Sequence, residues 1–394
     1  MNTFNNLGIP EKILNTLTAS GYINPTPIQE QVIPLALAGH DVLGNAQTGT
    51  GKTAAFAVPA IAHLMKNSSN IVLILLPTRE LAAQVLAETT KIMGKSLKIP
   101  TALLIGGDSV PKQLKQINMG ARLIVGTPGR INDHLRSRKL RLGLADMLIL
   151  DETDRMLDMG FGKQLESIIS EISPARQTLM LSATMPKNIM ELAGKYLRDP
   201  KRVSVDTENT VTDNVTQELI ETTDELKYSV LTELLDKQPS SVLIFTKTKY
   251  GAERLSKRLL REKFLACVLH GDLSQAKRER AIREFKSQKC IIMVATDIAA
   301  RGLDISHIDT VINYDLPQAA EDYIHRIGRT GRAGRNGVAI NLLTKNDHQK
   351  WRDICKLLKT ECGLPDAPRE PRAPSTPGKP RAKRPYHRRP KRNK

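Results

Sequence analysis

The sequence predicts an α/β protein with two tandem domains, each built on a parallel β-sheet. Its length is the first observation, since 394 residues exceed what one hydrophobic core usually supports. The second is that short apolar runs alternate with helix-like segments, which is the pattern of βαβ units. The third is that these runs form two series, separated by the polar segment VDTENTVTDNV, which resembles a linker in composition.

Each apolar run is expected to be a strand. The first series lies at 41–46, 71–77, 102–107, 122–127, 147–152 and 178–184, and the second at 241–248, 266–271, 290–297, 310–315 and 337–343. The expected division is a first domain over 1–205, a linker over 206–215, a second domain over 216–362 and a tail over 363–394. Ligands of parallel sheets bind at the carboxyl ends of the strands, so we expect the sites to face the cleft between the domains.

The tail is expected to be disordered and basic. From Asp366 to Lys394 it holds eleven Lys or Arg residues against two acids, together with seven prolines and a single aromatic residue. Such a composition cannot bury enough apolar surface to fold. Because its net charge is strongly positive, binding of nucleic acid is favoured over a purely solubilising role.

Composition also limits the classes of molecule that this protein is expected to bind. A net charge of +18 and a pI near 9.8 favour a polyanion, with nucleic acid first and an anionic membrane surface second. The longest apolar candidate, AAFAVPAIAHLM, is too short for a membrane span, and the first residues do not resemble a signal peptide. A cytoplasmic location is therefore expected. The four cysteines lack metal-ligand spacing, so no zinc site is expected.

A phosphate-binding loop is predicted at AQTGTGKT. It follows an expected strand and precedes an apolar helix, so its backbone N–H groups and the helix N-terminus favour phosphate. A dinucleotide fingerprint also matches the glycine spacing, but no acid closes the next strand. The expected cradle comprises Ala46, Gln47, Thr48, Gly49, Thr50, Gly51, Lys52 and Thr53. Lys52 is expected to contact the β- and γ-phosphates of a nucleoside triphosphate, and Thr53 to hold Mg²⁺.

Three carboxylates follow the expected strand at 147–152, in the stretch LILDETD. On their own these acids suit a cap of the next helix as well as they suit a Mg²⁺ site. A phosphate loop nearby favours the second interpretation. Asp151 is then the metal residue, and Glu152 the base that orients and deprotonates an attacking water.

Nine blocks in the same order resemble those of the DEAD-box ATP-dependent RNA helicases of superfamily 2, of the bacterial type with a basic tail. They are GYINPTPIQ, AQTGTGKT, PTRELA, the pair Gly106-Gly107, TPGR, DETD, SAT, ATDIAARGLD and HRIGRTGR, and the resemblance extends from Phe4 to about Leu343. It implies two RecA-like domains, an RNA-dependent ATPase and helicase activity, ATP and Mg²⁺ as cofactors and RNA as partner.

The resemblance assigns nucleotide contacts to matching positions. It implies that Gln29 reads the adenine edge, with Phe4 and Tyr22 packing near the base, and that Asp304 approaches the nucleotide from the second domain. The catalytic set that it implies, with the residues above included, is Lys52, Glu152, Arg329 and Arg332. The two arginines match the family's arginine fingers, which stabilise charge on the transferred phosphoryl group.

The resemblance also implies an RNA track and a coupling set. The track comprises Thr78, Arg79, Gly107, Thr127, Arg130, Gln275, Arg278 and Thr296. Contacts of this kind reach phosphates and sugars, so RNA binding is expected to be largely independent of sequence. The coupling set between ATP and RNA comprises Asp154, Ser182, Thr184, His325 and Arg326.

One position departs from the family pattern, because Thr153 stands where DEAD has alanine. The chemistry is expected to survive, while the effect on coupling is open. Taken singly, several blocks have plainer interpretations, such as a solvated basic loop for GRTGRAGRNG or a simple turn for Gly106-Gly107. Their joint order favours the functional interpretation.

Two rival functions stay open from the sequence, a double-stranded DNA translocase of the same superfamily and a non-catalytic RNA clamp or annealer. The sequence does not decide among ribosome assembly, RNA decay and cold adaptation, so ribosomal precursors and RNA-decay complexes both stay open as partners. A monomeric core is expected, with no membrane partner.

Overall fold

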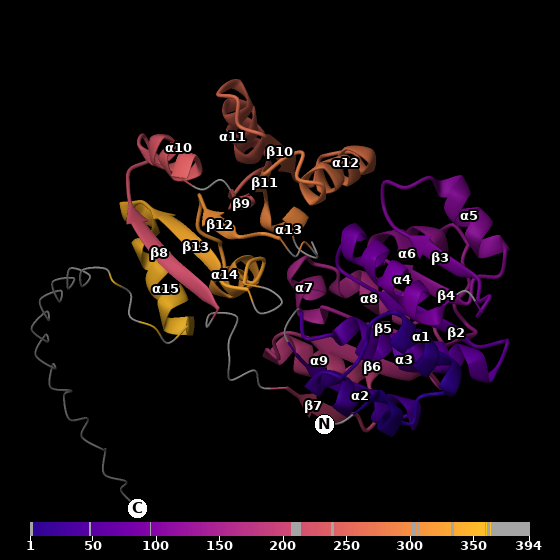
Figure 1. The fold of residues 1–394 in the computed structure, drawn as a ribbon. Helices are drawn as coiled ribbons and strands as arrows, with labels where there is room; N and C mark the ends of the chain where they lie inside the picture. Colours follow the sequence, from indigo (N-terminus) through magenta and orange to yellow (C-terminus); the bar gives the residue numbers. More distant parts are fainter. Residues whose placement is uncertain are drawn as a thin grey trace, which may run out of the picture.

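The chain folds into two parallel sheets flanked by helices (Figure 1). The computed structural model describes residues 3–46, 49–94, 96–205, 214–237, 240–300, 305, 307–331, 335–358, 360 and 363. Every strand pairing in it is parallel. The predicted α/β class with two tandem parallel-sheet domains is confirmed.

The first sheet has the strand order β3-β4-β2-β5-β6-β1-β7. Its strands are β1 Val42–Asn45, β2 Ile71–Leu75, β3 Thr101–Leu104, β4 Leu123–Gly126, β5 Ala145–Leu150, β6 Gln177–Ser182 and β7 Lys201–Ser204. Its helices are η1 Phe4–Leu7, α1 Glu11–Ala19, α2 Pro27–Leu37, α3 Lys52–Lys66, α4 Arg79–Met93, α5 Val110–Asn118, α6 Pro128–Arg136, α7 Thr153–Asp158, α8 Gly162–Ile169 and α9 Lys187–Tyr196.

The second sheet has the strand order β10-β11-β9-β12-β13-β8. Its strands are β8 Val215–Glu221, β9 Val242–Phe245, β10 Ala266–Leu269, β11 Ile292–Ala295, β12 Thr310–Asn313 and β13 Gly337–Leu343. Its helices are α10 Lys227–Lys237, α11 Lys249–Arg261, α12 Gln275–Lys286, α13 Asp297–Ala300, α14 Ala320–Ile327, η2 Lys345–Asp347 and α15 His348–Leu358.

Helices cover both faces of each sheet because the central strands are apolar on both faces. In β2, Val72 and Ile74 belong to one hydrophobic cluster, whereas Leu73 and Leu75 belong to the cluster on the other face. This arrangement leaves the carboxyl ends of the strands as the polar edge of each sheet. None of the described helices has the length and apolar composition required to cross a bilayer.

Two edge strands were not predicted, β7 and β8. In β7 only Val203 is buried and in β8 only Val215 is, so neither has the continuous apolar run of a central strand. One boundary needs correction: Val215, the last residue of the expected linker, pairs with Gly337 and is the first residue of β8. The rest of the expected linker, apart from Asn214, and nearly all of the tail lie outside the described residues.

Candidate functional site

The phosphate loop lies between β1 and α3, in the order that the sequence predicts. Gly49 and Gly51 have φ of +88° and +89°, a backbone region that disfavours any side chain. At Gly51 a Cβ atom would also lie 2.5 Å from Gln29 Nε2, so glycine is required there. The loop therefore brings its backbone to the start of α3, where Lys52 and Thr53 occupy the first turn.

Lys52, at the start of α3, has Asp151 as an ion-pair partner but no hydrogen-bond acceptor in the described part of the chain. Its side chain is 5% exposed, and its Nζ lies 3.8 Å from Asp151 Oδ1 without a hydrogen-bond partner among the described residues. A buried ammonium group without acceptors is costly. The oxygens of a phosphate are the acceptors that this position fits.

Asp151 follows β5 and is almost completely buried. Burial raises the pKa of Asp151 to about 6, Lys52 opposes that shift, and the neighbouring Glu152 and Asp154 add to it. A divalent cation at this carboxylate would compensate the excess of negative charge. Among the described residues, no three His, Cys, Asp or Glu side chains form a group that could hold a metal alone. The donors therefore fit Mg²⁺ that arrives with the phosphates, since Mg²⁺ is usually bound by few carboxylates plus substrate oxygens.

Glu152 takes an unusual backbone conformation at the start of α7. Its φ of 50° and ψ of 49° place a non-glycine residue in the left-handed region, which costs about 1–2 kcal/mol. Arg155, one turn later, donates from Nη1 to Glu152 Oε2 at 2.8 Å, with both side chains buried. The carboxylate is thereby held in one orientation beside Asp151.

Asp154 links the acids to β6. Its Oδ2 accepts hydrogen bonds from Ala183 N at 3.1 Å and from both the N and the Oγ1 of Thr184 at 2.9 Å, while its own N donates to Ser182 Oγ at 3.3 Å. The structure thus brings three members of the predicted coupling set into one hydrogen-bond network.

Thr153, the departure from the family pattern, is accommodated without an unsatisfied hydroxyl. Its side chain is fully buried, and its Oγ1 donates to Leu181 O at 3.1 Å, with Leu150 O at 3.4 Å. The threonine therefore adds a second tie between α7 and β6, next to the Asp154 network.

The residues predicted around the base lie on η1, on the segment before α2 and on α2 itself. Phe4 and Tyr22 form an edge-to-face pair with centroids 6.3 Å apart, and Tyr22 Oη donates to Glu88 at 2.8 Å. Gln29 accepts from Thr26 N through Oε1 and donates from Nε2 to Gly51 O, both at 3.0 Å. Gln29 is thus a brace of the phosphate loop, and its contact with adenine stays a prediction.

Three arginines of the predicted RNA track converge where the two domains meet. Arg79, Arg130 and Arg278 line a cavity of about 370 Å³ together with Thr78 and Thr127. Burial lowers the pKa of Arg79, the positive charge of Arg278 lowers it further, and Glu80 partly opposes the shift. A cluster of like charges in a cavity fits a bound polyanion.

Close packing at this cavity explains the Gly106-Gly107 pair. Gly107 has a φ of +80°, and a Cβ there would lie 2.5 Å from Arg79 Nη1 and 3.2 Å from Gln275 Cβ of the second domain. Thr296 lies apart from this group, on a cavity of about 870 Å³ that Asp154, Thr184 and His325 also line. The predicted track is therefore divided between two cavities at the domain boundary.

Arg326 is held by hydrogen bonds to other residues of the second domain. Its Nε and Nη2 donate to the two carboxylate oxygens of Asp297 at 2.5 and 2.7 Å, and its Nη1 donates to Asn313 Oδ1 at 2.8 Å. Arg329 is also buried and donates from Nε to His325 O at 3.1 Å. Arg326 thus holds α14 against α13 and β12, and its predicted part in coupling acts through that position.

Four predicted site residues lie outside the described part of the chain. They are Gln47, Thr48, Asp304 and Arg332. Their roles stay predictions.

Sequence reasoning missed Glu80, although it lies in the PTRELA block. Its Oε1 accepts from Arg278 Nε at 2.7 Å, with the two side chains 9% and 7% exposed, and so forms an ion pair between the domains. It also missed Arg155 and Asp297, the partners of Glu152 and Arg326. The sequence did offer one signal for Glu80: it is an acid next to Arg79, in the expected first turn of a helix, where it could pair with an arginine of the RNA track.

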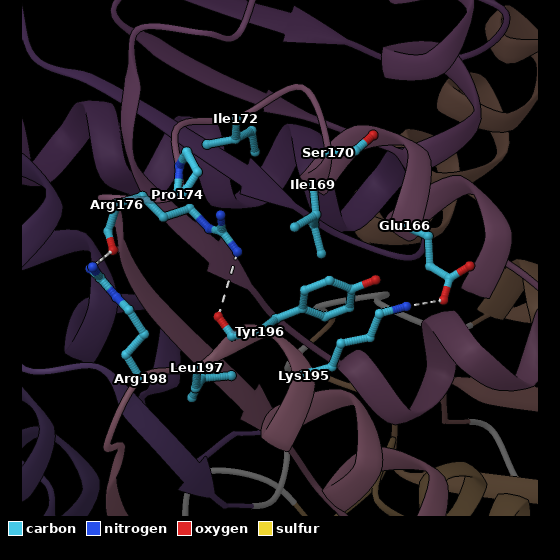
Figure 2. Close-up of a pocket in the computed structure, with 10 residues that line it drawn as sticks. All are labelled: Glu166, Ile169, Ser170, Ile172, Pro174, Arg176, Lys195, Tyr196, Leu197 and Arg198. Carbon is cyan, nitrogen blue, oxygen red and sulfur yellow. Dashed lines mark hydrogen bonds and ion pairs between the residues drawn. The ribbon is translucent and has the colours of Figure 1, made fainter.

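A separate cavity of about 500 Å³ lies at the opposite, amino-terminal edge of the first sheet, where β6 and β7 begin (Figure 2). Its cations are engaged with their own surroundings: Arg176 donates to Tyr196 O, Arg198 donates to Arg176 O, and Lys195 pairs with Glu166 at 2.7 Å. None of the predicted site residues lines it, so it carries no part of the ATP or RNA site.

Comparison with protein families gives two matches that follow each other along the chain. Residues 26–192 match the DEAD/DEAH box helicase family, and residues 226–334 match the helicase conserved C-terminal domain. The ATP-dependent RNA helicase CshA of Limosilactobacillus reuteri is 42% identical over 90% of this chain and 72% of its own length. The chain belongs to the DEAD-box family of ATP-dependent RNA helicases. A second relative, DEAD-box ATP-dependent RNA helicase CshA of Geobacillus kaustophilus, is 43% identical over 88% of this chain and 74% of its own.

Solved structures of the family also match this DEAD-box chain and confirm its two RecA-like domains. Saccharomyces cerevisiae Dbp5 bound to RNA and ADP BeF3 has a TM-score of 0.82 at 32% identity, covering 90% of this chain and 93% of Dbp5. A DEAD box protein from Methanococcus jannaschii is 40% identical, covering 91% of this chain and 98% of its own, yet has a TM-score of 0.52. The match to the RNA-bound yeast protein therefore extends over both domains of this chain.

Proposed function

We propose that this DEAD-box enzyme binds RNA across the boundary of its two domains and uses ATP to separate short duplexes locally. The observation that carries the proposal is the cavity at which Arg79 and Arg130 of the first domain meet Arg278 of the second. Only the joined domains bring these three guanidinium groups together. RNA bound there favours the joined arrangement, and ATP bound at the phosphate loop favours it too, so each increases the affinity for the other.

In the ATP step, Lys52 contacts the β- and γ-phosphates, and Glu152 accepts a proton from the water that attacks the γ-phosphorus. Arg155 keeps the Glu152 carboxylate oriented through the 2.8 Å ion pair. Thr53 and Asp151 would hold Mg²⁺, which neutralises charge on the phosphates. Arg329 and Arg332 approach from the second domain and stabilise charge that develops in the transition state. Hydrolysis therefore requires both domains.

Coupling between hydrolysis and RNA passes through the Asp154 network in this proposal. The backbone and side chain of Thr184 bond to Asp154, whose neighbours in the chain include the proposed base. Asp154 and Thr184 also line the same cavity as Thr296 and His325 of the second domain. Loss of the γ-phosphate would thereby be transmitted to the domain boundary, which opens and releases RNA.

The free energy available from one closure of the two domains limits the length of RNA duplex that the closure can separate. Taking the mean DNA stacking value of about 1.4 kcal/mol per step, a duplex of about ten base pairs costs on the order of 10 kcal/mol to open. Local separation of short duplexes is therefore proposed in place of long translocation. Contacts to phosphates and sugars make the binding largely independent of sequence.

Unwinding assays with RNA duplexes of graded length test this proposal. We expect rates that fall steeply with duplex length and depend on ATP, and ATPase turnover that RNA stimulates and DNA does not. Equal rates on short and long duplexes, or stimulation by double-stranded DNA, would support the translocase instead. Full activity in Glu152→Gln would support the clamp or annealer.

A further inference from the structure

A second basic groove lies on the second domain, along the outer face of α11. It has a volume of about 540 Å³ and is lined from α11 by Lys249, Tyr250, Glu253, Arg254, Lys257 and Arg261, with His270 and Asp272 across from them. The inner face of the same helix packs against the sheet through Ala252, Leu255 and Leu259. The groove is thus built from the solvent side of one well-anchored helix.

The charges of this groove leave two guanidinium groups without counterions. Asp272 pairs with Lys249 at 2.5 Å, and Glu253 pairs with Lys257 at 3.2 Å and with His270 Nε2 at 2.9 Å. No carboxylate among the described residues pairs with Arg254 or Arg261. Both arginines line the groove, so the groove presents unpaired positive charge to an incoming ligand.

An exposed aromatic ring lies in the same groove, one helical turn before Arg254. Tyr250 is 75% exposed, which is unusual for a large ring on a well-packed helix. Aromatic rings next to Lys and Arg are the stacking platforms on which proteins bind single-stranded nucleic acid without sequence preference. Tyr250 and Arg261 are eleven residues apart, which is about 16 Å along a helix and exceeds one nucleotide step.

The groove adjoins the cavity between the domains. Gly271 lines that cavity, whereas its two chain neighbours, His270 and Asp272, line the groove. Arg278, one of the three arginines of the cavity, donates from Nη1 to His270 O at 2.9 Å. One loop therefore forms the ridge between the two sites, and a strand that leaves the cavity at this end meets α11 next.

We propose that single-stranded RNA extends from the cavity over this ridge and binds along α11, with a base stacked on Tyr250 and phosphates on Arg254 and Arg261. The inference rests on the proposed function, since it extends the same RNA path. It assigns to the second domain a site for RNA that flanks the segment held between the domains. The position of the groove directly beside the cavity favours RNA over an acidic protein segment as the occupant.

The test uses the full-length chain and three RNAs: the shortest single strand that gives full ATPase turnover, and the same strand extended at its 5′ or at its 3′ end. Half-saturating RNA concentrations are measured at two salt concentrations. For wild type we expect tighter binding from one of the two extensions only. Tyr250→Ala should weaken that extended RNA about fivefold or more and leave the shortest RNA unchanged, whereas Tyr250→Phe should bind as wild type. Arg254→Gln with Arg261→Gln should flatten the log–log salt slope by roughly 1.4.

A charge-matched control is Arg136→Gln with Arg138→Gln, two exposed arginines at the far end of α6 in the first domain. The inference is overturned if this control loses as much affinity as the α11 pair, or if the α11 variants weaken the shortest RNA equally. Unchanged RNA binding in all α11 variants would also overturn it and indicate an acidic protein segment as the occupant. Arg278→Gln separates the two proposals, because it should weaken all three RNAs. If it weakened none, the proposed RNA path between the domains would itself be wrong.

Discussion

The ion pair between Glu80 and Arg278 is expected to set how strongly the enzyme depends on RNA. It joins the two domains at 2.7 Å and is almost fully buried. In Glu80→Gln the amide oxygen can still accept from Arg278, but the negative charge is lost. Arg79 and Arg278 would then lack the carboxylate between the domains until RNA phosphates replace it, while Arg130 keeps its ion pair with Asp133 at 3.7 Å. We therefore expect closure without RNA to weaken and closure with RNA to persist.

The size of this effect follows from the bond that changes. A hydrogen bond to a charged group contributes about 1.5–3 kcal/mol and a neutral one about 0.5–1.5, so the substitution removes roughly 1–1.5 kcal/mol. Since about 1.4 kcal/mol corresponds to a tenfold change, the closed population without RNA should fall about five- to tenfold. Solvent screening reduces this energy only slightly, because the side chains of Glu80 and Arg278 are 9% and 7% exposed.

ATPase turnover is measured without RNA and at saturating RNA, and the two values report domain closure in the absence and in the presence of RNA. In Glu80→Gln, turnover without RNA should fall about five- to tenfold, while turnover at saturating RNA should stay close to wild type. Glu284→Gln is the matched control, since Arg280 and Glu284 form an ion pair of the same 2.7 Å length within α12. The reasoning is refuted if Glu80→Gln lowers both turnover values equally, or if it behaves as Glu284→Gln does.

Four further predictions follow from the site. Glu152→Gln should retain nucleotide binding, block hydrolysis and give a long-lived complex with RNA in the presence of ATP, so fast RNA dissociation in a chase experiment would contradict its role as base. Arg332→Ala should lower kcat far more than it weakens ATP binding, because the charge that it meets develops in the transition state, and equal losses would indicate ground-state binding. Thr153→Val should lower the free energy of unfolding by about 1 kcal/mol in denaturant titrations, because it removes the buried bond to Leu181 O, and unchanged stability would show that this bond contributes nothing. Truncation after about Leu364 should raise the half-saturating RNA concentration for several unrelated RNAs and flatten the salt slope by roughly 0.7 per lost phosphate contact, whereas a lower kcat at saturating RNA would show a catalytic part for the tail.

Most of the fold could be predicted because buried parallel strands are apolar on both faces. All eleven predicted runs are strands, from DVLGNA at β1 to GVAINLL at β13. The missed strands, β7 and β8, lie at sheet edges, where one face or one side contacts solvent and polar residues are tolerated. Their sequences therefore lack the signal on which the prediction depended.

The candidate site also has one part that the sequence predicts and another that depends on the tertiary structure. The phosphate loop and the acids are local features, because a strand, a glycine turn and a helix start position them within a few residues of one another. The hydrogen bonds of Asp154 to Thr184 join residues thirty positions apart, and only the pairing of β5 with β6 brings them together.

By itself the sequence determined the two parallel sheets, the phosphate loop, the order of the family's blocks and the basic tail. These follow from periodicity, turn residues and charge, which are properties of short segments. Only the tertiary structure decided that Glu80 holds Arg278 across the domain boundary, that Gln29 braces the phosphate loop and that Thr153 bonds to β6. Each of these depends on the distance between groups that lie far apart in the chain, and that distance is set by how the helices, strands and the two domains pack.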